Sequence, residues 1–127
     1  MKNQTDQFCQ LLREKYPYIT KKADELYRTK WYLMGDEFLS FAWFEELANA
    51  LNSEMINKVD CGEHIEMLKQ IETKYKSADN KLKEAIDVSF VENLFWKVPE
   101  KSSRPYWQAL PKKLRELYLN FHTSAPR

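Results

Sequence analysis

The sequence predicts an all-α fold, a single compact domain of five or six packed helices spanning residues 1–127. Three observations favour this class. Glycine occurs only 2 times, so tight hairpins and phosphate-cradling loops, which need positive φ, are disfavoured. Apolar side chains recur at helical spacing along the chain, and no alternating pattern indicates a strand. The length suits one domain that buries a core of its own without disulfides or a structural metal.

The N-terminal half contains three predicted helices. The first covers residues 6–16 and ends before Pro17, because the residue before a proline avoids the α region. The second follows with Thr20 as its N-cap. The third, residues 38–51, has apolar side chains over an arc of roughly 200°, which predicts a central helix with neighbours on several sides. Its remaining positions are Glu45, Glu46, Asn49 and Asn52, and we interpret the adjacent pair Glu45 and Glu46 as a solvated edge.

The C-terminal half contains the other helices and one loop. Asp60 and Glu63 fit a capping box at the start of a helix with one narrow apolar row, which predicts an outer position. Ser77 can cap the next helix, which runs to Trp96. Residues 99–106, which include the sequence KSSRP, have loop composition and predict a loop. Pro111 suits the first position of a final helix.

Charge and hydropathy narrow the class of protein. The chain has 20 basic and 19 acidic residues, a formal charge of +1, whereas a nucleic-acid-binding face needs a positive excess. We therefore expect no direct nucleic-acid binding. The longest apolar-rich stretch, FLSFAWFEELANAL, falls short of the roughly 20 residues of a membrane span, so we expect no membrane association. The first residues, MKNQTDQF, lack the apolar core of a signal peptide, and 2 cysteines are too few for a disulfide framework, which predicts a cytoplasmic protein.

Residues for catalysis, metal binding or cofactor binding are sparse. His64 lies three residues after Cys61, but no second pair completes a four-ligand zinc site. His122 lies in a terminal segment with no partner motif. Gly35 and Gly62 stand alone, so there is no glycine-rich phosphate loop, and no nucleophile elbow surrounds a serine or cysteine. We therefore expect no metal, no cofactor and no enzymatic activity.

The stretch VSFVENLFW, residues 88–96, places Glu92 and Asn93 inside an apolar run. A buried unpaired carboxylate is costly or takes up a proton, so it should find a partner. We interpret the pair as buried structural polar residues, with Glu92 accepting hydrogen bonds from free N–H groups at the start of an adjacent helix such as the one that Pro111 opens. An active site and a partner-binding patch are the alternatives.

A wider pattern surrounds this stretch. Five segments follow one another in this order: YPYI, WYLMGDEFLSFAWFEELANAL, a helix of alternating charge, AIDVSFVENLF and LPKKLRELYLNF. This order resembles small all-helical bacterial immunity proteins of contact-dependent growth inhibition and polymorphic toxin systems. The sharpest part of the resemblance is VSFVENL. The resemblance implies a cytoplasmic protein that binds a cognate toxin, often a nuclease, as a one-to-one complex and blocks it sterically. It implies no catalytic residues. Immunity proteins against nucleases are often acidic, so this balanced chain would need a local acidic patch.

A protein that acts through an interface needs exposed anchors, and Trp, Tyr and Arg contribute most to binding energy. We predict aromatic and basic anchors around the expected loop, and acidic contacts before and after the central helix. These candidates are Trp96, Arg104, Tyr106, Trp107, Asp36, Glu37, Asp60, Glu63 and Glu66. The alternative function is a helical adaptor or regulatory module that binds another protein, or a nucleic acid through cations interleaved with aromatic residues.

Overall fold

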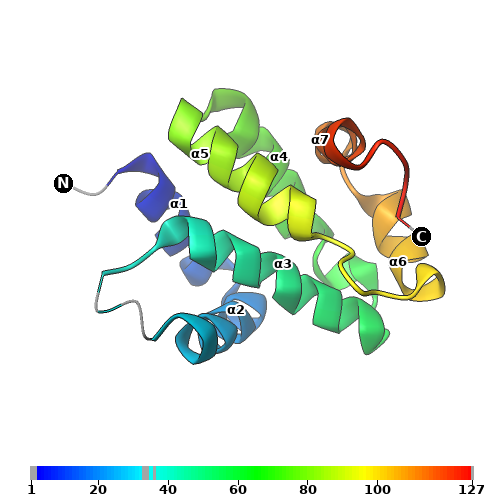
Figure 1. Cartoon of the computed structure of the whole chain (residues 1–127), viewed down its shortest axis with the longest axis horizontal. Coiled ribbons are helices and arrows are strands. Elements are labelled where there is room, and N and C mark those ends of the chain that lie inside the picture. Colours follow the sequence, from blue (N-terminus) through cyan, green and yellow to red (C-terminus); the bar gives the residue numbers. More distant parts are fainter. Residues whose placement is uncertain (1–2, 33–34, 36, 127) are drawn as a thin grey trace.

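Helix α3 crosses the middle of the computed structural model, with helices on both sides of it (Figure 1). The structure describes residues 3–32, 35 and 37–126. Within these ranges seven α-helices and three short helices follow one another without a strand. The α-helices are α1 (Gln4–Lys15), α2 (Pro17–Trp31), α3 (Ser40–Ile56), α4 (Ile65–Ser77), α5 (Asn80–Glu84), α6 (Glu100–Ala109) and α7 (Lys112–His122). The short helices are the 3₁₀-helix η2 (Cys61–Glu63), the π-helix η3 (Ala85–Phe90) and the 3₁₀-helix η4 (Val91–Asn93).

The predicted all-α class is confirmed, but the predicted loop at residues 99–106 is wrong. Residues 100–109 form α6, the helix missing from the predicted five or six. Pro105 lies inside this helix, although a proline cannot donate the backbone hydrogen bond of its turn. Ser103 and Tyr106 of α6 are both buried, so tertiary packing of one helix face overrides the loop-like composition.

Two predicted caps are also wrong. Asp79, rather than Ser77, caps α5, and its carboxylate accepts a hydrogen bond from the backbone N–H of Leu82 at 2.9 Å. Helix α2 already begins at Pro17, so Thr20 lies within it. A proline is preorganised for the first turn of a helix, which moves the start of α2 upstream of the best side-chain cap.

The segment from α5 through η3 to η4 is one continuous helical run whose hydrogen-bond register changes along its length. It lies along α3 in Figure 1. Its buried side chains recur at helical spacing and form one face: Leu82, Ala85, Ile86, Phe90 and Val91. The run ends at Leu94, whose backbone is extended.

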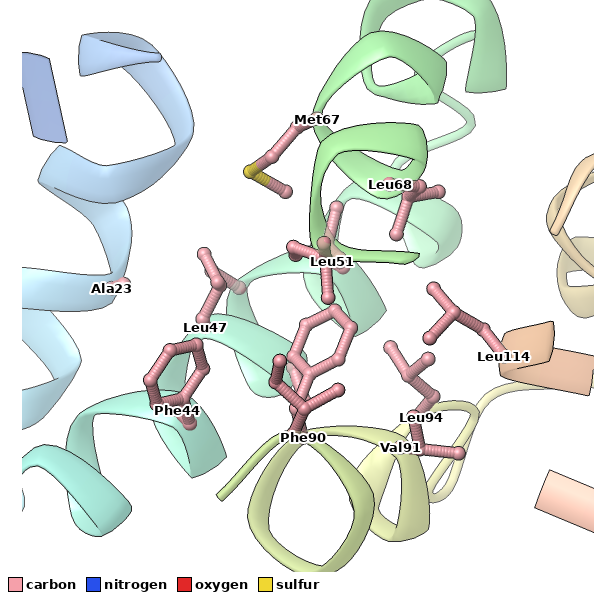
Figure 2. Close-up of a cluster of buried hydrophobic side chains, with 14 of the residues drawn as sticks. Ala23, Phe44, Leu47, Leu51, Met67, Leu68, Phe90, Val91, Leu94 and Leu114 are labelled. Carbon is pink, nitrogen blue, oxygen red and sulfur yellow. The ribbon is translucent and has the colours of Figure 1, made fainter. Parts of the chain in front are cut away.

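The hydrophobic core lies between α3, α4, this run and α7, as Figure 2 shows for Phe44, Leu51, Leu68, Phe90 and Leu114. Burial of a side chain of this size stabilises the fold by about 1.5–3 kcal/mol. The central position predicted for residues 38–51 is confirmed, because α3 has fully buried side chains directed to several neighbours. Within the described ranges, no helix is long and apolar enough to span a membrane.

Helix α3 also buries polar side chains that lie outside its apolar arc. Glu46 and Asn52 are both buried, so the solvated edge predicted for Glu46 is wrong. The reason for Glu46 is that α2 covers it: Nζ of Lys30 lies 3.0 Å from its Oε1, and Nε1 of Trp31 donates to its Oε2 at 3.0 Å. A buried carboxylate is tolerated when such partners compensate its lost hydration.

Candidate functional site

The turn after η4 presents Trp96 at the surface. Trp96 is 64% exposed, whereas its neighbour Phe95 is buried. Phe95 and Lys97, on either side of it, have φ angles of 70° and 55°, a left-handed conformation that residues other than glycine adopt rarely. Each such residue costs of order 1–3 kcal/mol, so the conformation persists only where surrounding contacts fix it.

Asn52 of α3 supplies those contacts. Its Nδ2 donates to the carbonyl oxygen of Asn93 at 2.9 Å, and its Oδ1 accepts a hydrogen bond from the backbone N–H of Phe95 at 2.7 Å. Asn52 is 5% exposed, so both bonds form away from water, where they are stronger. They satisfy backbone groups at the point where the helical ladder of η4 ends.

An aromatic cluster supports the turn from inside. The rings of Phe95, Trp107 and Tyr118 contact one another edge to face, with centroid distances between 5.3 and 5.9 Å. His122 stacks on Tyr118 with a centroid distance of 4.0 Å. Trp96 follows Phe95 and exposed Phe121 precedes His122, so both exposed aromatic side chains emerge from this cluster. The cluster therefore gives the Trp96 turn a rigid base.

One cation lies over the ring of Trp96, and two more follow in the next helix. Nζ of Lys97 lies 5.8 Å from the centroid of the Trp96 ring. Lys101 and Arg104 of α6 are exposed, and Arg104 pairs with Glu100 at 3.1 Å. Such a solvent-exposed pair contributes little to stability.

The four predicted anchors therefore differ in accessibility. Trp96 and Arg104 are exposed, as an interface requires. Tyr106 is buried, and its hydroxyl donates to the carbonyl oxygen of Val59 at 2.7 Å, so its selection as a surface anchor does not agree with the structure. Trp107 is partly buried in the aromatic cluster. The helical spacing of α6 explains this, because a helix in place of a loop turns Tyr106 inward.

The predicted acidic residues do not gather into one patch. Glu37 precedes α3, whereas Asp60, Glu63 and Glu66 follow it, and all four are exposed. A helix with the 17 residues of α3 is about 25 Å long, which separates the two groups. Asp60 caps η2 by accepting a hydrogen bond from the backbone N–H of Gly62 at 3.1 Å. Asp36, the remaining acidic candidate, lies outside the described residues.

Glu92 and Asn93 are half-buried rather than buried. Burial first, and then the charge of Asp87, raise the pKa of the Glu92 carboxyl, while His122 opposes them. The carboxylate that accepts a hydrogen bond at the start of α7 is that of Glu72, at 2.9 Å from the backbone N of Lys113, so the expected pairing of Glu92 with this helix start is wrong. Nδ2 of Asn93 donates to the carbonyl oxygen of Ser89 at 2.7 Å. The structural role of Asn93 is thus local to its own helical run.

A second feature, which the sequence analysis missed, surrounds the carboxylate of Glu54. Glu54 is 0% exposed, yet three side chains donate to it. Nε2 of His64 lies 2.8 Å from its Oε1, and its Oε2 accepts from Nζ of Lys22 at 2.7 Å and from the hydroxyl of Tyr18 at 3.3 Å. Burial alone would raise the pKa of Glu54, but the hydrogen bonds from Lys22 and His64 outweigh it and lower the pKa. The carboxylate therefore stays ionised inside the protein.

A pocket of about 410 Å³ opens beside this network. Its walls come from the start of α2, from the segment that follows α3 and from α4. They consist of Tyr16, Pro17, Tyr18, Ile19, Val59, Glu63, His64 and Met67. Small-molecule sites commonly measure roughly 300–1,000 Å³, so this pocket has the size of a ligand site.

The arrangement of His64 differs from that of a metal ligand paired with Cys61. Its Nε2 is directed to Glu54, and its ring stacks on Tyr18 at a centroid distance of 6.3 Å. Burial and the charge of Asp60 raise the pKa of the Cys61 thiol. In the described part of the chain, no group of three or more His, Cys, Asp or Glu side chains is placed to hold a metal ion.

Comparisons with known proteins give one match. A protein-family model described as Domain of unknown function (DUF7674) matches residues 9–123. No curated protein and no solved structure matches the chain significantly. The matched residues include the Trp96 turn and the network around Glu54, so both features lie within the shared domain.

Proposed function

We propose, for a chain that belongs to the DUF7674 family, a non-catalytic protein-binding function: it binds and neutralises a cognate bacterial toxin by steric blockage in the cytoplasm. The observation that carries the proposal is the exposed Trp96 on a turn held by buried Asn52. Binding energy at protein interfaces concentrates in such Trp anchors. A preorganised anchor also loses little conformational entropy when it binds.

The choice of a toxin as partner rests on the resemblance of the VSFVENL segment and its surroundings to bacterial immunity proteins. This segment, residues 88–94, directly precedes the Trp96 turn and passes the Asn52 contact. The proposed one-to-one complex would therefore use the surface that this segment shapes.

Charge suggests where on a nuclease toxin the contact would fall. A cleft that binds phosphate is itself positively charged, so exposed Lys97 beside Trp96, and exposed Lys101 and Arg104 of α6, would be repelled by it. A neutral or acidic surface next to the cleft suits them better. The helical domain would then block access by its bulk, without mimicking the nucleic acid.

Co-expression with a toxin domain encoded beside the gene tests the proposal. We expect restored growth and a one-to-one complex with the wild-type chain. The variant Trp96→Ala should keep its fold but lose protection, because it removes an exposed anchor. Tyr32→Ala, which removes a similarly exposed aromatic ring at the end of α2, is the matched control and should still protect. A neighbouring toxin that neither binds the wild-type chain nor is neutralised by it would overturn the proposal.

The second candidate function is an adaptor that binds a single-stranded nucleic acid. The exposed Trp96 ring beside Lys97 favours it, because bases stack on aromatic rings while lysines neutralise phosphates. The dependence of binding affinity on salt concentration distinguishes the two functions, because nucleic-acid affinity falls steeply as the salt concentration rises. A complex with a protein through Trp96 should weaken much less.

A further inference from the structure

A second pocket, of about 510 Å³, lies where the C-terminal end of α3, the segment that follows it and α6 meet. Its wall residues come from the ranges 55–61 and 99–106. We propose that this pocket binds a small organic anion, a carboxylate carried on a compact apolar body. The proposal does not depend on toxin binding. Two unpaired lysines and the apolar walls of the pocket support it.

Two cations line this pocket without an acidic partner. Lys58 and Lys101 are both exposed, and both contribute to the wall. Within the described part of the chain, neither ammonium group forms an ion pair with a carboxylate. A lysine ammonium is a compact charge on a flexible stem, so both groups can turn toward one bound anion without breaking an existing ion pair.

The wall also contains one acid, Asp60, whose charge opposes that of one lysine. Its Oδ1 accepts a hydrogen bond from the backbone N–H of Gly62 at 3.1 Å, which holds the carboxylate at the start of η2. Two lysines and one aspartate leave the wall with an excess of one positive charge. An anionic ligand is therefore favoured over a cationic ligand of the same shape.

The remaining walls favour an apolar body on the ligand. Met55, Val59, Pro99 and Pro105 supply apolar surface. Tyr106 adds its ring, because its hydroxyl already donates to the carbonyl oxygen of Val59 at 2.7 Å. Apolar walls with a few polar groups are typical of small-molecule sites, which commonly measure roughly 300–1,000 Å³. An anion with an apolar body therefore fits this pocket better than a bare anion does.

Titration of the wild-type chain with four compounds tests the proposal. Benzoate, benzamide and benzamidine share one shape and carry a negative charge, no charge and a positive charge, whereas acetate keeps the carboxylate and lacks the ring. We expect benzoate to bind about five-fold or more tightly than each of the others, and its advantage over benzamide to shrink as the salt concentration rises. Chemical-shift titration of the backbone amides measures the affinities. Equal affinity for benzoate and benzamide, or tighter binding of benzamidine, would overturn the proposal.

The reactivity of Cys61 reports whether the ligand occupies this pocket. Cys61 lines the pocket and is half-exposed, whereas Cys9 is buried and serves as an unreactive internal control. Saturating benzoate should slow the alkylation of Cys61 by iodoacetamide, and benzamidine at the same concentration should not. Mass spectrometry measures the rate at mildly alkaline pH, where the lysines remain charged. An alkylation rate that benzoate leaves unchanged would place the ligand elsewhere and refute the assignment.

Charge variants assign the binding to the two lysines. Lys58→Gln and Lys101→Gln each remove one charge at an exposed position, so both variants should fold and should bind benzoate with an affinity closer to that for benzamide. Lys69→Gln, which removes an exposed lysine of α4 outside the pocket, is the matched control and should bind benzoate like wild type. Asp60→Asn keeps a side-chain oxygen for Gly62 and removes the opposing charge, so it should tighten benzoate binding. The same benzoate affinity in all three lysine variants would show that the lysines do not form the site.

Discussion

Asn52 and Phe95, 43 residues apart in the sequence, are joined by a hydrogen bond of 2.7 Å between the side-chain oxygen of Asn52 and the backbone N–H of Phe95. This bond connects the central helix α3 to the surface turn that presents Trp96. It makes the conformation of an exposed side chain depend on a residue in the core. Under the proposed function, stability and partner binding would therefore be coupled at this position.

Asn52→Ala should lower the free energy of unfolding by about 1–3 kcal/mol, because it leaves the buried backbone N–H of Phe95 without its partner and removes one of the two donors to the carbonyl oxygen of Asn93. Urea denaturation measures the change. Asn57→Ala is the matched control: Asn57 is exposed, its side-chain bond to Ser53 is long at 3.5 Å, and its replacement should change stability little. Equal stability of Asn52→Ala and wild type would mean that the turn does not depend on this side chain.

Glu54→Gln should destabilise the protein by about 3 kcal/mol at neutral pH, because it removes the buried charge that Lys22 and His64 surround. The pKa of Glu54 is lowered in the folded state. The ionised Glu54 carboxylate therefore contributes fully to the free energy of unfolding above its unfolded-state pKa. This contribution is lost as the pH falls through the lower folded-state pKa. The stability difference between Glu54→Gln and wild type should shrink over that acidic range.

The control for this change is Glu100→Gln, which removes the carboxylate of the exposed pair with Arg104. Exposed i, i+4 pairs contribute about 0.3–0.5 kcal/mol, so the effect should be several times smaller. Denaturation curves at neutral and acidic pH give both comparisons. A Glu54→Gln effect as small as that of Glu100→Gln would show that solvent screens the buried network.

Most of the helices could be predicted from the sequence because apolar periodicity and low glycine content are local signals. Helix α6 could not, since its proline and two serines have loop propensity and only the packing of Ser103 and Tyr106 makes it helical. The solvated edge predicted for Glu46, which α2 covers, is wrong for a related reason. Periodicity gives the angle of a side chain on its helix, but it does not identify the neighbouring helix that buries it.

The candidate site was predictable in part. Trp96 was expected at the surface, and it is exposed. Glu54 was missed, although it lies three residues after Leu51 and seven after Leu47, on the apolar face of its helix. A carboxylate at such a position is a signal for a buried ionic network. Its partners Lys22 and His64 depend on tertiary contacts and could not be read from spacing.

Glu92→Gln should slightly stabilise the protein at neutral pH, by less than about 1 kcal/mol. Burial and Asp87 raise the pKa of Glu92, so its ionised form is less favourable in the folded chain than in the unfolded chain. This cost disappears as the pH falls below the unfolded-state value of about 4.3, where both states are protonated. Thermal unfolding at neutral and acidic pH measures it, with exposed Glu84→Gln as the control that should not change. A destabilised Glu92→Gln would instead indicate a favourable partner for the carboxylate, such as His122.

Pro105→Ala should stabilise the protein by about 1–2 kcal/mol, because alanine restores the backbone N–H inside α6 and removes the clash of the proline ring with the preceding turn. A more flexible unfolded chain offsets about 0.4–1 kcal/mol of that gain. Pro105 is exposed, so the change removes no core contact. Pro111→Ala is the matched control: this proline precedes α7, where no helical N–H is missing, and its replacement should give the opposite sign. Chemical denaturation measures both variants, and destabilisation of both would mean that Pro105 positions α6 for the burial of Tyr106 rather than merely being tolerated there.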